Sequence, residues 1–146
     1  MARLAAGVVV VTSKAGEDYR GLTAGSLVSV SLAPPLVSVA LDRNSTTLAA
    51  VLESRRFNVS VLARAQEFLA DRFAGRAPSV DWRTLSHRMG ANGIPLLDGC
   101  AAWLECRLVQ SHEAGDHELC VGAVDAASVG SGEPLVLWDR AFWSLH

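Results

Sequence analysis

The stretch LVSVALDRNSTTLAAVLES, residues 36–54, passes from a β-strand into an α-helix within a few residues. Residues 36–41 follow the two-residue alternation that predicts a strand. Asn44 and Ser45 are helix N-cap candidates, and apolar residues follow them at the spacing of a short helix. We therefore expect a helix N-terminus directly beyond the end of a strand.

Two further strands are predicted towards the N-terminus. Within the second of them, Val28, Val30 and Leu32 alternate with serines, which indicates a half-buried strand. The prolines that follow end this strand, because proline lacks the N–H group that a sheet needs. The strands cover residues 8–11 and 19–32, and the polar segment 12–18 is predicted to be the hairpin loop between them.

More short elements are predicted towards the C-terminus. A strand at 57–62 precedes a second helix whose apolar face carries Ala65, Phe68, Leu69 and Phe73, and Gly75 can end that helix. Beyond an irregular segment, 77–93, strands are expected at 102–109, 119–124, 135–138 and 142–145, with a polar loop at 112–116.

Many short strands with two inserted helices favour one mainly β (α+β) domain, residues 1–146, built as a closed or nearly closed antiparallel barrel. The chain has 146 residues, of which 50% are hydrophobic and 19% charged, so we expect it to bury a subunit interface. Its formal net charge of −2 and scattered basic residues argue against a nucleic-acid partner.

Location and metal content can also be judged from the sequence. The apolar start of the chain superficially resembles a secretory signal, but its valine run suits a buried strand better, and no apolar run is long enough for a membrane span. The three cysteines lack disulfide or zinc spacing, so we expect buried thiols in a cytoplasmic protein. The spacing of His87, His112 and His146 favours no metal site.

Residues 41–47 carry the first candidate site. A helix N-terminus presents unpaired N–H groups and the positive end of the helix dipole, and here hydroxyls, an amide and Arg43 surround it. These groups describe a socket for one phosphate. An ordinary N-cap beside a surface arginine is the alternative.

Two other segments could contact a ligand. Residues 21–26 combine small side chains with two hydroxyls, so the backbone could approach a flat aromatic ligand; a β-bulge is the alternative. Residues 115–118 place His117 where it could contact a nicotinamide, although a solvated turn explains it equally well. A hydrolytic triad of Ser26, His117 and Asp116 lacks a nucleophile elbow.

The ordered segments resemble the flavin reductase family with the FMN-binding split barrel, the reductase partners of two-component flavin-dependent monooxygenases. The matching segments, which together span nearly the whole chain, are GVVVVTS (7–13), GLTAGS (21–26), SVSLAPPLV (29–37), DRNSTT (42–47), FNVSVL (57–62), residues 66–73, GDH (115–117) and PL (134–135).

The resemblance implies roles for individual residues. The flavin ring and ribityl chain would lie against Thr23, Ala24 and Ser26. The phosphate would lie against 44–46 with Arg43 as a helper, and the nicotinamide against His117, a positioning group. The complete set of expected flavin-binding residues is Thr23, Ala24, Gly25, Ser26, Leu41, Asp42, Arg43, Asn44, Ser45, Thr46 and Phe73. Gly25, Leu137 and Arg140 depart from residues usual in the family, which are serine, tyrosine and glycine.

The same resemblance implies a homodimer that binds FMN or FAD and receives a hydride from NADH or NADPH. It also implies a separate monooxygenase partner for the reduced flavin. Two alternatives remain open at this point: a protein of this fold that keeps FMN tightly for electron transfer or sensing, and a split barrel that binds a non-redox ligand. Neither the nucleotide specificity nor the partner follows from the sequence.

Overall fold

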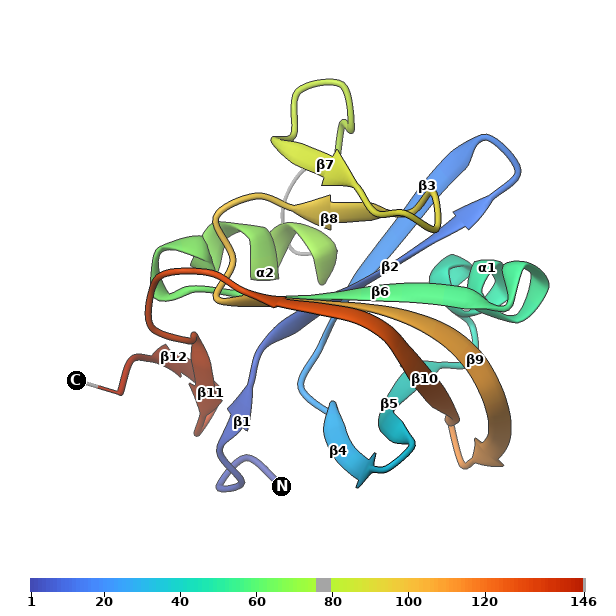
Figure 1. Ribbon diagram of the computed structural model, residues 1–146. Helices are drawn as coiled ribbons and strands as arrows, with labels where there is room; N and C mark the ends of the chain where they lie inside the picture. The colour runs from blue at the N-terminus through green and yellow to red at the C-terminus, as the bar shows by residue number, and fades with distance from the viewer. Residues whose placement is uncertain (76–79, 146) are drawn as a thin grey trace.

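The computed structural model describes residues 1–75 and 80–145 (Figure 1). These residues form twelve strands, two α-helices and one 3-10 helix. The strands are β1 (Ala6–Gly7), β2 (Val9–Ala15), β3 (Asp18–Ala24), β4 (Val28–Leu32), β5 (Pro35–Asp42), β6 (Arg56–Val61), β7 (His87–Met89), β8 (Pro95–Leu97), β9 (Ala102–Ala114), β10 (His117–Val129), β11 (Val136–Trp138) and β12 (Ala141–Trp143). The helices are α1 (Thr46–Ser54), η1 (Arg64–Gln66) and α2 (Glu67–Phe73).

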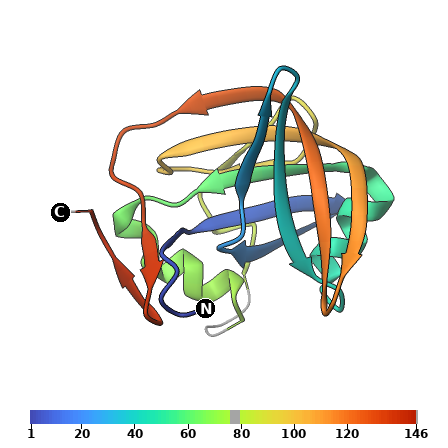
Figure 2. The same cartoon turned by 90° about the horizontal axis from the view of Figure 1, so that it is seen from below.

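An antiparallel sheet in the order β3-β2-β6-β9-β10-β5-β4 forms the split barrel. The sheet curls until β5 lies near β3, and Figure 2 shows the curvature of β5, β9 and β10 around the interior. The Ser26 hydroxyl bridges this junction, accepting from the Ala40 amide at 3.0 Å and donating to the Ala40 carbonyl at 3.1 Å. The predicted mainly β barrel with two short helices is confirmed.

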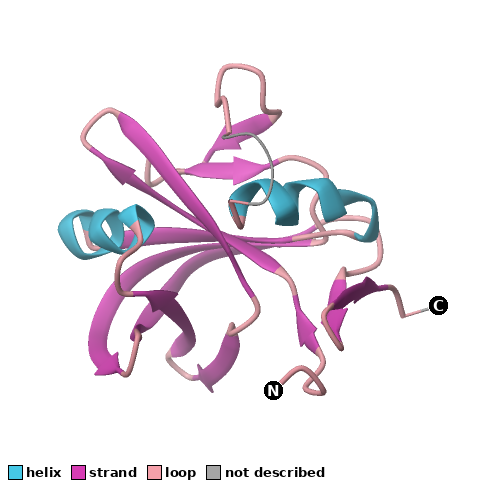
Figure 3. Cartoon of the chain, turned by 180° about the vertical axis from the view of Figure 1, so that it is seen from behind, coloured by secondary structure: helices cyan, strands magenta, loops and turns pink. Residues whose placement is uncertain are grey.

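Two buried cores hold the barrel and its helices together. Leu41 and Phe57, each 0% exposed, belong to the core that also packs against α1. Leu69 and Phe73 from α2 join Leu97 in the second core. Seen from behind, the two helices lie at opposite ends of the molecule (Figure 3). The helix that follows β5 is thereby fixed by packing at one end of the barrel.

The predicted strand at 19–32 is wrong in two respects. It is divided into β3 and β4, which lie on opposite edges of the sheet. Val28, Val30 and Leu32 are also 55%, 52% and 88% exposed, so this strand is not half-buried in the single chain. Alternation indicates which residues share a face, but it does not show what covers that face.

Both hairpin loops are shorter than predicted, because polar residues continue the strands. Thr12 and Ser13 are fully buried in β2, where their hydroxyls donate to the Pro95 and Arg56 carbonyls at 2.7 and 2.8 Å. Likewise, β9 extends to Ala114 and β10 begins at His117. Hydrogen-bonded hydroxyls can occupy buried strand positions, so polarity alone was a poor indicator of a loop.

Two other predictions need correction. Ala65 and Phe68 are exposed, and the buried face of η1 and α2 carries Gln66, Leu69, Ala70 and Phe73 instead. The segment predicted to be irregular, 77–93, contains β7, which pairs with β8; its residues 77–79 lie outside the described part. A three-residue strand is too short for a periodicity to reveal it.

The two C-terminal departures from the family pattern lie in the small sheet β1-β11-β12. Leu137 packs against the second core. Arg140 has a φ of 64° in the turn between β11 and β12, a left-handed conformation that favours glycine. This backbone conformation therefore explains why the family usually has glycine at the position.

Two remaining expectations concern the cysteine thiols and a possible membrane span. Cys100, Cys106 and Cys120 are free and buried, and burial raises the pKa of these thiols to about 11, 12 and 11, respectively. They therefore stay protonated at neutral pH and are poor nucleophiles. None of the described helices has the length and apolar character needed to span a membrane.

Candidate functional site

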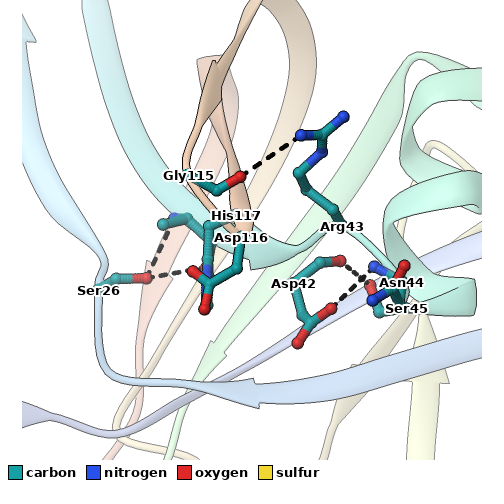
Figure 4. A network of polar contacts seen from close by, with 9 residues as sticks. Ser26, Asp42, Arg43, Asn44, Ser45, Gly115, Asp116 and His117 are labelled. Atoms are coloured by element: carbon teal, nitrogen blue, oxygen red, sulfur yellow. Dashed lines mark hydrogen bonds and ion pairs between the residues drawn. The ribbon is translucent and has the colours of Figure 1, made fainter.

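The end of β5 is where the three candidate segments meet. Asp42, the last residue of β5, is directly opposite His117 in the ladder with β10. The segment after β3 reaches the same strand through the Ser26–Ala40 hydrogen bonds. Figure 4 shows Ser26, the 42–45 segment and the turn before β10 around this point. Segments far apart in sequence thus form one polar region.

The beginning of α1 is organised by internal hydrogen bonds. Ser45 is its N-cap, and its hydroxyl accepts from the Leu48 amide at 3.0 Å. The Asp42 carboxylate accepts from the Asn44 amide at 2.8 Å, and the Asp42 carbonyl accepts from the Ser45 amide at 3.0 Å.

These bonds occupy the Asn44 and Ser45 amides, so the amides that remain for an anion lie further along the chain. The amides of the first helical residues have no acceptor within a helix, and here they belong to Thr46 and Thr47. Thr46 is exposed, so its amide and hydroxyl can reach a ligand, whereas Thr47 is buried. The helix N-terminus fits a phosphate, with Thr46 at its centre.

Arg43 points away from this helix terminus (Figure 4). Its guanidinium lies 3.2 Å from the Glu113 carboxylate and donates to the Gly115 carbonyl at 3.4 Å. The Arg43 amide donates to the Asp116 carbonyl at 3.0 Å. In this conformation Arg43 ties β5 to the β9–β10 turn and does not face the phosphate position.

Residues 23–26 form the junction between β3 and β5. The Thr23 hydroxyl donates to the Ala70 carbonyl of α2 at 2.6 Å, and Ala24 is buried. Gly25 is exposed, and a Cβ atom built on it would lie 3.6 Å from the Ala6 Cβ, an ordinary contact distance. Packing therefore leaves room for the Cβ atom of the serine that the family usually has there. Leu41 is fully buried, so only its main chain can face a ligand.

A groove of about 430 Å³ opens beside the helix terminus. The described residues that line it are Tyr19, Arg20, Gly21, Thr46, Arg72, Phe73, Gly75, Val80 and Trp82. A Cβ atom on Gly21 would lie 2.7 Å from a Phe73 ring carbon, so glycine is what allows this ring to pack against β3.

Among these lining residues, sequence reasoning identified Thr46, Phe73 and Gly21, the last as part of the segment 21–26. The sequence pattern places Tyr19 and Arg20 in a strand and Trp82 in an irregular segment, so it does not mark them as site residues. Their one usable signal was composition, since arginines and aromatic residues are frequent in binding sites. Their convergence depends on the packing of α2 against β3, which the sequence pattern does not reveal.

His117 is oriented by its neighbour at the start of β10. Its Nδ1 atom lies 2.7 Å from the Asp116 carboxylate, whose pKa is lowered by this hydrogen bond and by the imidazole charge. An ionised carboxylate only accepts hydrogen bonds, so Nδ1 is the donor. The Nε2 atom is then left for a ligand.

The described residues contain no cluster of three or more His, Cys, Asp or Glu side chains that could hold a metal ion. The polar groups at the end of β5 instead provide amide, hydroxyl and imidazole contacts. The nearby groove adds guanidinium groups and aromatic rings. This combination suits an aromatic ligand that carries phosphate.

Comparison with known proteins agrees with this chemistry. An NADH-dependent flavin reductase from Rhodococcus sp is 38% identical over 154 residues, which cover 100% of this chain and 83% of that protein. The reductase component of 4-hydroxyphenylacetate 3-monooxygenase from Thermus thermophilus is 36% identical, with coverage of 97% of this chain and 90% of that protein.

A solved structure shares the whole architecture. The NADH:FAD oxidoreductase SgcE6 of Streptomyces globisporus C-1027, in complex with NAD and FAD fragments, has a TM-score of 0.90 at 35% identity, covering 97% of this chain and 86% of that one. Residues 1–146 also match the family model described as a flavin reductase like domain. The barrel, the polar region at the end of β5 and these similarities together show that the chain belongs to the flavin reductase family.

Proposed function

We propose that this protein is an NADH-dependent flavin reductase that transfers a hydride from the nicotinamide to FMN or FAD. The observation that carries the proposal is the convergence of the α1 N-terminus, residues 23–26 and His117 at the end of β5. The names of the relatives support NADH as the reductant. When bound, the flavin supplies the redox chemistry, accepting the hydride at N5 from the nicotinamide C4.

The role of the chain is to bind and orient the two rings. The Thr46 amide and hydroxyl would hold the flavin phosphate, helped by the positive end of the α1 dipole. The main chain of 24–26 would contact the flavin ring. His117, held by Asp116, would present Nε2 to the nicotinamide carboxamide. Alignment of two reactants in one site supplies much of the rate enhancement in such a reaction, so no general acid or base is required.

We expect His117→Ala to raise the KM for NADH by about tenfold and to leave the Kd for FMN within about twofold, because one charge-assisted or neutral hydrogen bond is worth roughly 1–2 kcal/mol. Steady-state kinetics with varied NADH and calorimetric titration with FMN measure the two quantities. His112→Ala is the matched control, since His112 is exposed on β9 and hydrogen-bonds to Gln110 at 3.3 Å. Unchanged kinetics in His117→Ala would exclude this residue from the site.

A homodimer and a separate monooxygenase complete the proposal. The exposed apolar row of Val28, Val30 and Leu32 on the edge strand β4 supports the dimer, because such a strand is usually covered. Sedimentation velocity measures the oligomeric state directly. The relative that is a monooxygenase reductase component supports a partner that consumes the reduced flavin. The three free thiols support a cytoplasmic location.

A further inference from the structure

The turn between β9 and β10 carries the proposed nicotinamide contact. Gly115 and Asp116 form this turn, and Gly115 has a φ of 66°, the left-handed conformation that glycine adopts in tight hairpin turns. The Asp116 carboxylate lies 2.7 Å from the Nδ1 atom of His117. The position of the His117 ring therefore depends on the position of the turn.

Arg43 holds this turn from the end of β5. Its Nη2 atom lies 3.2 Å from Oε1 of Glu113, the residue that begins the last two positions of β9. Its Nη1 atom donates to the Gly115 carbonyl at 3.4 Å, and its main-chain amide donates to the Asp116 carbonyl at 3.0 Å (Figure 4). Both the side chain and the main chain of Arg43 thus contact the segment that precedes His117.

The ion pair of Arg43 with Glu113 is exposed, so it acts on the position of the turn more than on stability. The two side chains are 47% and 74% exposed, and such pairs contribute little to the free energy of unfolding. The chain between Arg43 and α1 is held separately, because Asp42 accepts from the Asn44 and Ser45 amides. The helix terminus is therefore organised without the Arg43 side chain.

We propose that Arg43 is a positioning residue for NADH and not a ligand of the flavin phosphate. Together with Glu113 it holds the β9–β10 turn in the position from which His117 contacts the nicotinamide. The inference rests on the proposed flavin reductase function and assigns Arg43 to its nicotinamide side. The two roles of Arg43 predict opposite effects of removing the Glu113 charge. A phosphate ligand would be freed and would bind FMN more tightly, whereas a positioning residue would lose its partner, and only the use of NADH would suffer.

The test measures the KM for NADH, kcat and the FMN Kd in the wild type, Arg43→Gln and Glu113→Gln. Each variant should raise the KM for NADH by about three- to fivefold and leave kcat and the FMN Kd within about twofold, the range that one exposed charged contact explains. Neither change should raise the KM further in the His117→Ala background, because the contact that the turn positions is already lost there. A merely structural role would not show this dependence on His117. The preserved FMN affinity also reports that a variant is folded.

Matched control variants are Arg107→Gln and Asp125→Asn, which break an exposed ion pair of 2.9 Å on the same two strands, β9 and β10. They should leave the KM for NADH and the FMN Kd unchanged. A raised FMN Kd in Arg43→Gln with a lowered one in Glu113→Gln would overturn the proposal and return Arg43 to the phosphate. An unchanged KM in both variants, or a further rise in the His117→Ala background, would overturn it too. A wild type that fails to bind FMN, or to oxidise NADH in its presence, would instead refute the proposed function.

Discussion

Thr46→Glu is expected to raise the Kd for FMN by about a hundredfold or more without destabilising the protein. The carboxylate would lie at the proposed phosphate position, and two like charges about 4 Å apart at a protein surface repel by roughly 4 kcal/mol. In the free protein, however, an acidic residue in the first turn of a helix interacts favourably with the dipole, by about 0.3–1 kcal/mol. Ligand binding and stability therefore change in opposite directions.

Calorimetric titration with FMN and thermal unfolding of the free protein measure these two effects. Thr46→Gln is the control, because it has nearly the same side-chain length as glutamate without the charge. We expect the Gln variant to lose less than about tenfold in affinity, the loss that one hydroxyl contact explains. Equal FMN affinity in the Glu and Gln variants would show that the phosphate does not lie at the α1 N-terminus.

Phe57→Ala is expected to reduce the free energy of unfolding by about 3–5 kcal/mol, a large part of the roughly 5–15 kcal/mol typical of a domain. Phe57 is fully buried in β6, and its removal leaves a cavity among the surrounding strands. Urea denaturation measures the loss. A change below about 1 kcal/mol would contradict the assigned packing of this core.

Gly122 provides an independent check on the same contact. A Cβ atom there would lie 2.5 Å from the Phe57 ring, so Gly122→Ala should cost about 1–3 kcal/mol through overpacking. The pair Phe57→Leu and Gly122→Ala should cost less together than the sum of the two single changes, because the smaller side chain vacates the space that the new methyl group needs. Strict additivity would mean that the two residues do not meet.

Much of the barrel could be predicted because its strands alternate clearly and its main helix is capped. The strand that became β5, the helix that became α1 and the Ser45 cap follow from periodicity and side-chain chemistry. The candidate site was predicted from a helix terminus and from the resemblance to the family, and the structure brings the segments named for it together. Local sequence patterns predicted the elements whose conformation depends on interactions between residues close in sequence.

The groove could not be predicted, because it depends on tertiary contacts. Gly21 is required only because the Phe73 ring packs against it. Trp82 lines the same groove although it lies far from β3 in the sequence. The direction of Arg43 is likewise set by Glu113, which is 70 residues away. The exposure of β4 is a property of one chain in isolation, and an alternating sequence cannot show which surfaces a second subunit covers.

The most direct test of the central claim is anaerobic mixing of the purified protein with excess FMN and NADH, followed at the visible absorbance maximum of the flavin. We predict rapid bleaching of the whole flavin pool over many turnovers, with a rate that rises with NADH. Flavin that binds but keeps its colour in the presence of NADH would contradict the reductase assignment and favour an electron-transfer or sensing role, and absence of flavin binding would contradict the site itself.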